Sequence, residues 1–149
     1  MSAKTPNALR DHVRGEVIVS SDPDYEDARL VHNGMIDRRP AVVVRVANAG
    51  DVIATVRYAR DNGLDLSIRG GGHSGPGFGT NDGGVVIDFS RMRGVRVDPA
   101  AMTARAEGGV TWGDFNAATH AFGLATTGGI ISTTGIAGFG SCNKTIITG

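Results

Sequence analysis

The sequence predicts an α+β fold in which helices flank a small mixed or parallel sheet, and two patterns lead to this prediction. The first is a strand–helix–strand succession between residues 41 and 69, where a β-branched run and an alternating run enclose a segment with helical apolar spacing. The second is a pair of alternating segments around Pro99, which is typical of a hairpin and is followed by another amphipathic segment. Strands and helices mixed in this order indicate a domain of mixed class.

The first residues predict little regular structure. Residues 1–21 are interpreted as an extended lead-in, and a short helix is expected from Pro23 to about His32. Proline suits the first turn of a helix, and the acidic residues beside it favour the positive end of the helix dipole. We therefore separate residues 1–33, the lead-in with its short helix, from a main domain over residues 34–149.

The main domain opens with a strand, a helix and a second strand. The run "AVVVRV" at residues 41–46 is typical of a buried strand, and the alternation in "LDLSI" at residues 64–68 predicts the next one. Asn48 is a favourable N-cap for the helix between them, and Gly63 can end it. The apolar side chains at helical spacing are Val52, Ile53, Val56 and Ala59. Because a helix joins them, the two strands are expected to pair in parallel.

The second half of the main domain predicts a strand, a hairpin and a helix. A buried strand is expected over residues 85–90, and the hairpin turns at Pro99. Thr111 can cap the helix, which Gly123 ends. The side chains of this helix that are expected to point inward are Trp112, Phe115 and Phe122. A second glycine-rich loop, which is also rich in threonine, follows the helix.

The composition excludes several classes of partner. The 149 residues carry 15 basic and 15 acidic side chains, so the formal net charge is zero. A neutral chain with no basic run is not expected to bind nucleic acid or an anionic membrane surface. No apolar stretch approaches the roughly 20 residues of a membrane span, and the polar N-terminus predicts no signal peptide. The single cysteine, Cys142, suits a reducing compartment, so a cytoplasmic location is expected.

Glycine is the anomaly of the composition. There are 23 glycines, and eight of them lie in "IRGGGHSGPGFGTNDGG", residues 68–84. Glycine is favoured where the main chain takes a positive φ or approaches another group closely. A run of bare amide N–H groups can also cradle a phosphate without any lysine. We therefore predict that this loop contacts an anionic group of a ligand.

Other interpretations of the loops fit less well. Residues 70–75 match the dinucleotide pattern G-x-G-x-x-G, but Pro76 and the following glycines leave no place for the helix of a Rossmann site. The same proline replaces the second glycine of a nucleophile elbow around Ser74. Residues 138–145 approach a phosphate-binding P-loop except at Asn143. The four histidines show no metal-ligand spacing, so no metal site is predicted.

Three segments in order carry a resemblance to a known family. They contain "RGGGHS" at residues 69–74, the strand and hairpin run that begins "GGVVIDFS", and "TTGIAG" at residues 133–138. Over about residues 30–139 the chain resembles the FAD-binding PCMH-type domain of the vanillyl-alcohol oxidase/p-cresol methylhydroxylase flavoproteins. Within that superfamily it is most similar to the berberine-bridge-enzyme-like, oxygen-dependent FAD-linked oxidases.

The resemblance implies which residues contact FAD. The first loop would wrap the pyrophosphate with its amide groups, and the second loop would line the other side of the cofactor. His73 matches the histidine that the family bonds covalently to the 8α-methyl group of the isoalloxazine ring. The implied contacts are Arg69, Gly70, Gly71, Gly72, His73, Ser74, Phe78, Gly128, Gly129, Thr133, Thr134, Gly135 and Gly138, with Val44 on the adenine side.

The resemblance also implies an activity. A hydride would pass from a small-molecule substrate, such as an alcohol, an amine or a sugar-like compound, to FAD, and molecular oxygen would reoxidise the flavin to give hydrogen peroxide. The position of the second, cysteinyl link of some relatives is Ile131 here, so attachment through His73 alone is expected. The family's catalytic groups would lie beyond residue 149, so the chain is expected to be a truncated and inactive portion of an oxidase. The alternative is a non-catalytic flavin-binding remnant.

Overall fold

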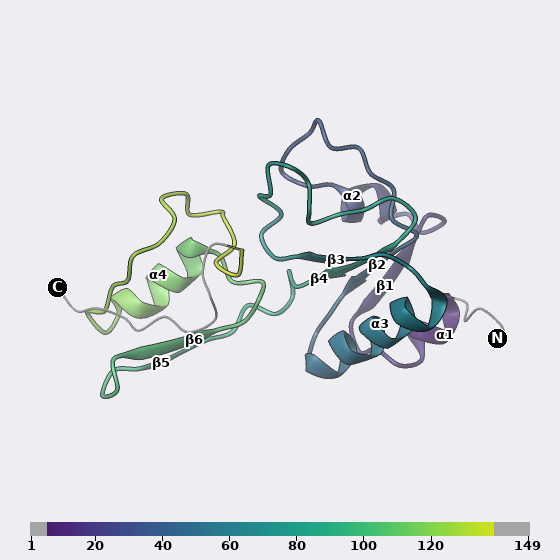
Figure 1. Cartoon of the computed structure of the whole chain (residues 1–149). Coiled ribbons are helices and arrows are strands. Elements are labelled where there is room, and N and C mark those ends of the chain that lie inside the picture. Colours follow the sequence, from purple (N-terminus) through teal and green to yellow (C-terminus); the bar gives the residue numbers. More distant parts are fainter. Residues whose placement is uncertain (1–5, 139–149) are drawn as a thin grey trace.

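The computed structural model describes residues 6–138 (Figure 1). Its helices and strands are, in chain order, α1 (Pro6–Arg10), β1 (Glu16–Val19), α2 (Tyr25–Arg29), β2 (Val42–Arg45), α3 (Ala49–Asn62), β3 (Leu66–Arg69), β4 (Val85–Asp88), β5 (Val95–Asp98), β6 (Thr103–Ala106) and α4 (Trp112–His120). Figure 1 shows two lobes, one built on β1 to β4 and the other on the β5–β6 hairpin and α4. The predicted α+β class is confirmed.

The larger sheet has the strand order β1-β2-β4-β3. β4 is parallel to both β2 and β3, whereas β1 is antiparallel to β2. Helices α1 and α3 cover one face of this sheet, and α2 covers the other (Figure 1). β2 and β4 therefore bury side chains on both faces, which explains their unbroken β-branched runs. The side chains toward α3 include Val42, Val44, Val85 and Ile87, and those toward α2 include Val43 and Val86.

Helix α3 begins as the sequence predicts. The Asn48 side chain accepts a hydrogen bond from the Asp51 amide, and Gly63 ends the helix with a left-handed φ of 64°. The Asp51 carboxylate is buried and accepts hydrogen bonds from the amides of Arg14, Gly15 and Ala47, each at 2.9 Å. Burial raises the pKa of Asp51, but these bonds outweigh it and lower the pKa below the usual 3.8. The carboxylate thus ties the residues before β1 to the start of α3.

Asp51→Asn is expected to lower the free energy of unfolding by about 1–3 kcal/mol at neutral pH, because its amide group would face amide donors. Because the folded pKa of Asp51 is lowered, its contribution is present above pH 3.8 and is lost as the pH falls through the folded value. The difference between wild type and variant should therefore shrink as the pH falls below about 4, as measured by urea unfolding. Asp65→Asn, at an exposed side chain, is the control and should show no such difference.

The second lobe is a hairpin packed on a helix. Strands β5 and β6 pair antiparallel, so the hairpin predicted around Pro99 is confirmed. Helix α4 starts with a capping box in which the side chains of Thr111 and Asp114 each bond the other's amide. Hydrogen bonds from Arg93 and then from Thr111 lower the pKa of Asp114 to about 2. The core of this lobe comprises Val110, Trp112, Phe115 and Leu124, against which Val95, Val97, Ala104 and Ala106 pack.

Several sequence-based expectations about elements are wrong. The extended lead-in contains α1 and β1, and β1 adds an edge strand to the sheet. Helix α2 spans only Tyr25–Arg29 rather than Pro23 to His32, and Leu30 after it is extended. The carbonyl groups of Ala28 and Leu30 at this end accept hydrogen bonds from the Arg69 guanidinium. Strands β2 and β3 do not pair with each other, because the wholly buried β4 lies between them.

Three apolar side chains of the predicted helices are exposed, among them Phe122, which was expected to point inward. Ile53 and Val56 lie on the outer side of α3, because its buried face instead carries Asp51 and Thr55, whose hydroxyl bonds the Asp51 carbonyl at 2.7 Å. Phe122 is 53 % exposed, and Leu124 fills the core below α4 in its place. Because buried polar residues that bond to each other lie on the inner face of α3, a pattern of apolar residues does not identify that face. Among residues 6–138, no helix is long and apolar enough to cross a bilayer.

Candidate functional site

Two glycine-bearing segments meet at the carboxyl end of β3. The first follows β3 directly, and the second comprises residues 132–138 after α4. Their main chains touch, because a Cβ atom built on Gly71 would lie 2.3 Å from the Gly135 nitrogen, and one on Gly135 would lie 2.4 Å from the Gly71 nitrogen. Neither residue can therefore carry a side chain without moving the other segment. This contact brings the two lobes together at the predicted ligand loop.

The second segment is held against the start of α4. The Gly113 amide donates to the Ser132 carbonyl at 2.9 Å, and the Trp112 amide donates to the Thr134 carbonyl at 3.0 Å. Gly135 also forms a β-bridge with Thr111. These bonds give a loop without regular structure a fixed path beside the glycine loop.

A hollow of about 390 Å³ lies between the two segments. Its lining comprises Ile68, Arg69, Gly70, Gly71, Gly72, His73, Ser74, Phe78, Gly79, Thr134, Gly135 and Gly138. A second hollow, of about 550 Å³, shares Gly70 to His73 with the first and is lined in part by His32, Arg45 and Arg91. Gly70 to His73 therefore border both hollows.

The amide groups of the glycine loop are available to a ligand. For the N–H groups of residues 70–74, the structure gives no acceptor among residues 6–138. The loop is shaped by its other groups instead. The Gly72 carbonyl accepts from the His32 amide at 3.1 Å, and the Ser74 hydroxyl accepts from the Phe78 amide at 3.1 Å. Successive free amide donors in a turn are the arrangement that binds phosphate oxygens.

The His73 ring lies at the junction of the two segments. Its Nδ1 lies 3.5 Å from the Thr134 hydroxyl oxygen. One face of the ring stacks on His32, with ring centroids 4.0 Å apart and planes 16° from parallel. The ring is half-buried and lines both hollows. It is therefore accessible to a ligand while two neighbours contact it.

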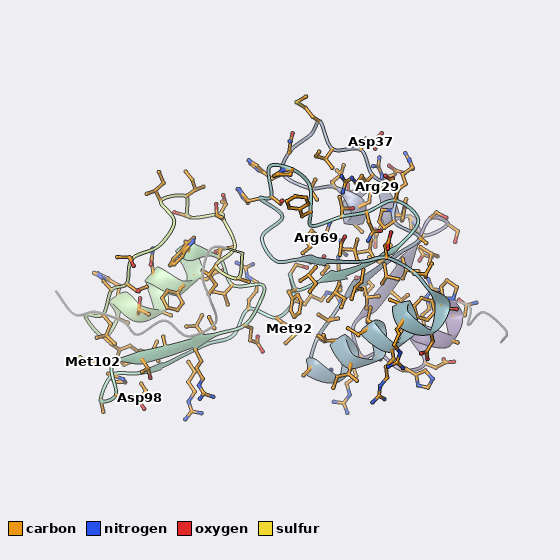
Figure 2. All side chains as sticks on the ribbon, in the orientation of Figure 1. Arg29, Asp37, Arg69, Met92, Asp98 and Met102 are labelled. Atoms are coloured by element: carbon orange, nitrogen blue, oxygen red, sulfur yellow. The ribbon has the colours of Figure 1, made fainter. Side chains whose placement is uncertain are left out.

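The Arg69 guanidinium is bonded to groups inside the protein. It is buried between β4 and the end of α2 (Figure 2). It donates to the Ala28 carbonyl at 2.6 Å, to the Leu30 carbonyl at 2.9 Å and to Asp88 Oδ2 at 2.8 Å. The charge of Arg69 is thus already balanced inside the protein, and the hollow is lined by the rest of the residue.

The structure brings most of the predicted contacts together. Arg69 to Ser74, Phe78, Thr134, Gly135 and Gly138 all line the 390 Å³ hollow. Gly128 and Gly129 do not, because they make room for the Trp112 indole, whose Cη2 would lie 2.2 Å from a Cβ on Gly128. Thr133 is exposed outside the lining, and Val44 is buried in the core beneath α3.

Sequence reasoning missed three residues at the site. Two of them, Ile68 and Gly79, line the hollow. Ile68 is exposed on edge strand β3, and its position directly before the glycine loop was a signal that could have found it. His32 had no local signal at all, because it reaches His73 only through the tertiary fold. Among the described residues, no group of three or more His, Cys, Asp or Glu side chains could hold a metal ion.

Comparison with known proteins gives consistent matches. The family model described as "FAD binding domain" matches residues 40–145. The chain is 40% identical over 138 residues to (R)-6-hydroxynicotine oxidase of Paenarthrobacter nicotinovorans, a match that covers 93% of this chain and 30% of that protein. The chain therefore spans about a third or less of the length of the curated relatives it matches.

Two solved structures have the same fold over most of the chain. The crystal structure of 6-hydroxy-D-nicotine oxidase from Arthrobacter nicotinovorans superimposes with a TM-score of 0.81 at 40% identity, covering 83% of this chain and 27% of that one. BBE-like 1 of Physcomitrella patens superimposes with a TM-score of 0.83 at 27% identity, covering 91% and 30%.

Proposed function

The chain belongs to the FAD binding domain family, in the PCMH-type form of the vanillyl-alcohol oxidase/p-cresol methylhydroxylase superfamily, and we propose that it forms the FAD-binding portion of a berberine-bridge-enzyme-like oxidase. One observation carries the proposal. Residues 70–74 line a hollow beside the segment that ends at Gly138, and the structure gives their amide groups no acceptor among the described residues. Those donors suit the oxygens of a pyrophosphate.

The residues present fit FAD at its phosphates. A diphosphate needs close donors, and side chains at Gly70, Gly71 or Gly72 would hold it away from the main chain. Since the Arg69 charge is already paired with Asp88, main-chain amides would supply the contacts and no free guanidinium would be needed. Thr134, Gly135 and Gly138 would contact the cofactor from the opposite side.

When bound, FAD would accept a hydride from a small-molecule substrate and be reoxidised by molecular oxygen to give hydrogen peroxide. The part of the chain described here would bind and orient the cofactor and exclude water from one of its faces. The relatives' names support oxidation of a small organic molecule, and the substrate class that we propose is an alcohol, an amine or a sugar-like compound. Groups that deprotonate the substrate would come from outside these residues.

We further propose that His73 bonds covalently to the 8α-methyl group of the flavin. The half-buried ring at the mouth of the hollow, with Thr134 at 3.5 Å, supports this role. Attachment would form a bond between an imidazole nitrogen of His73 and the 8α-carbon and would break one methyl C–H bond and the imidazole N–H bond. The two electrons, passed through the flavin, and the two protons would reduce one molecule of oxygen to hydrogen peroxide. The link would retain the cofactor and leave the amide groups to orient it.

His73→Ala is expected to reduce acid-stable flavin to background while leaving FAD that dissociates on denaturation. The reason is that the variant keeps the amide donors of the loop and loses the imidazole ring, and with it the nitrogen that would bond to the flavin. The measurement is the flavin absorbance of protein purified with FAD, before and after acid precipitation. His120→Ala, at an exposed histidine in the last turn of α4, is the matched control and should keep wild-type acid-stable flavin.

The outcomes separate three cases. Wild-type protein that releases all its flavin in acid would contradict the covalent link and leave FAD binding intact. Wild-type protein that binds no FAD at all would contradict the proposed function itself. Peroxide release across a panel of alcohols, amines and sugars, measured on the whole protein and not on this portion, then separates an oxidase from a flavin-binding remnant.

A further inference from the structure

The segment after α2 contacts the glycine loop at three consecutive points. The His32 amide donates to the Gly72 carbonyl at 3.1 Å, and the Asn33 side-chain amide donates to the Gly75 carbonyl at 2.9 Å. Between these two bonds, the His32 ring stacks on the His73 ring. The two hydrogen bonds therefore lie on either side of His73 along the chain, and the His32 ring covers one face of the His73 ring.

The base of this segment is itself fixed. Arg69, at the end of β3, donates to the carbonyl groups of Ala28 and Leu30 and pairs with Asp88 in β4. The sheet thus holds the chain that carries His32, and that chain holds the loop that carries His73. Through these hydrogen bonds the sheet restrains a loop that its glycine-rich sequence would otherwise leave flexible.

The loop needs this support because of its composition. Gly72 precedes His73 and takes a φ of 71°, and Ser74 and Gly75 follow it. Glycine has the largest conformational freedom to lose on ordering, so a ring on such a loop is poorly oriented by local structure. Contact with Thr134 alone, at 3.5 Å, fixes one edge and leaves the ring free to tilt. The stacked His32 ring restricts that tilt.

We propose that His32 is a positioning residue that orients the His73 ring for covalent attachment of the flavin, an inference that rests on the proposed function. His32 acts through the flat face of its ring and not through a proton. An aromatic ring of similar size without nitrogen should therefore serve as well, whereas a side chain without a ring should not. Misplacing a reacting group by about 1 Å can slow a reaction by orders of magnitude.

The test follows the rate at which acid-stable flavin appears after FAD is added to the flavin-free protein. His32→Ala should bind FAD and attach it at least about tenfold more slowly than wild type. His32→Phe, which keeps a stacked ring, should restore the rate to within about threefold of wild type. His12→Ala, at an exposed histidine outside the linings of both hollows, is the control and should match wild type. Equal FAD binding and thermal unfolding across the variants exclude loss of the fold.

The inference is overturned if His32→Ala attaches flavin at the wild-type rate, or if His32→Phe is as slow as His32→Ala. Either result leaves the proposed function standing, because wild-type protein would still hold acid-stable flavin. Wild-type protein that binds FAD and never forms acid-stable flavin would overturn the covalent role of His73 and this inference together. Failure of the His32 inference alone would thus appear in the His32 variants, whereas failure of the covalent link would appear in the wild-type protein.

Discussion

Arg69→Met is expected to lower the free energy of unfolding by about 3–5 kcal/mol, the cost of breaking a buried ion pair on one side. Arg69 and Asp88 are 7 % and 3 % exposed, and their side chains meet at 2.8 Å. Methionine matches the length of the arginine stem and supplies no donor. Asp88 would still accept a hydrogen bond from the Ser90 amide at 2.9 Å and would still lie near the more distant Arg45 guanidinium. The carbonyl groups of Ala28 and Leu30 would lose the donor that Arg69 provides.

Urea unfolding of the purified protein measures this effect. Arg91→Met is the matched control, because Arg91 forms an exposed pair with Glu16, and such pairs contribute about 0–1 kcal/mol. Adding Asp88→Asn to Arg69→Met should recover part of the lost stability, since it removes a buried charge that has lost its nearest cationic partner. A loss below about 1 kcal/mol for Arg69→Met would show that the pair does not hold α2 to the sheet.

Gly71→Ala is expected to weaken FAD binding at least about tenfold and to lower the free energy of unfolding by about 1–3 kcal/mol. The added Cβ would lie 2.3 Å from the Gly135 nitrogen and 2.7 Å from its Cα atom. Both are main-chain atoms, so no side chain can rotate away. The two segments must separate, and the amide groups of the first would then no longer face the second across the hollow.

Gly75→Ala is the control for this prediction. Gly75 lies in the same loop, but a Cβ there would meet no atom within 4 Å and would suffer no strain from a positive φ. Fluorescence titration with FAD and thermal unfolding of the two variants give the comparison. Equal FAD affinity in both variants would mean that the Gly71–Gly135 contact does not organise the cofactor site.

The sequence predicted those elements that local chemistry determines. Asn48 and Gly63 mark the ends of α3, and Thr111 begins α4, because a cap is a bond between near neighbours. The strand order could not be predicted in the same way. Nothing within the run at Val85–Asp88 indicates that it lies between β2 and β3 rather than beside one of them.

Glycine was the signal for the candidate site, and the FAD contacts that it suggests stay predictions. The loop at Gly70 to Ser74 and the segment with Thr134 and Gly135 do meet, as the resemblance implied. Gly128 and Gly129 lie against the Trp112 indole and do not line the hollow, and their contact with FAD stays a prediction. Whether a glycine faces a ligand or a tryptophan depends on residues distant in the sequence, and so does the pairing of His32 with His73.

The crossing of Gly71 and Gly135 has an evolutionary consequence. In most packed cores a larger residue at one position can be compensated by a smaller residue at the position that it contacts, so homologous proteins accumulate paired substitutions. Here both partners are already at the minimum size, and the obstacle on each side is the other's peptide backbone. No exchange of side chains can compensate, so descendants of this chain should change these two positions only by rerouting a whole segment.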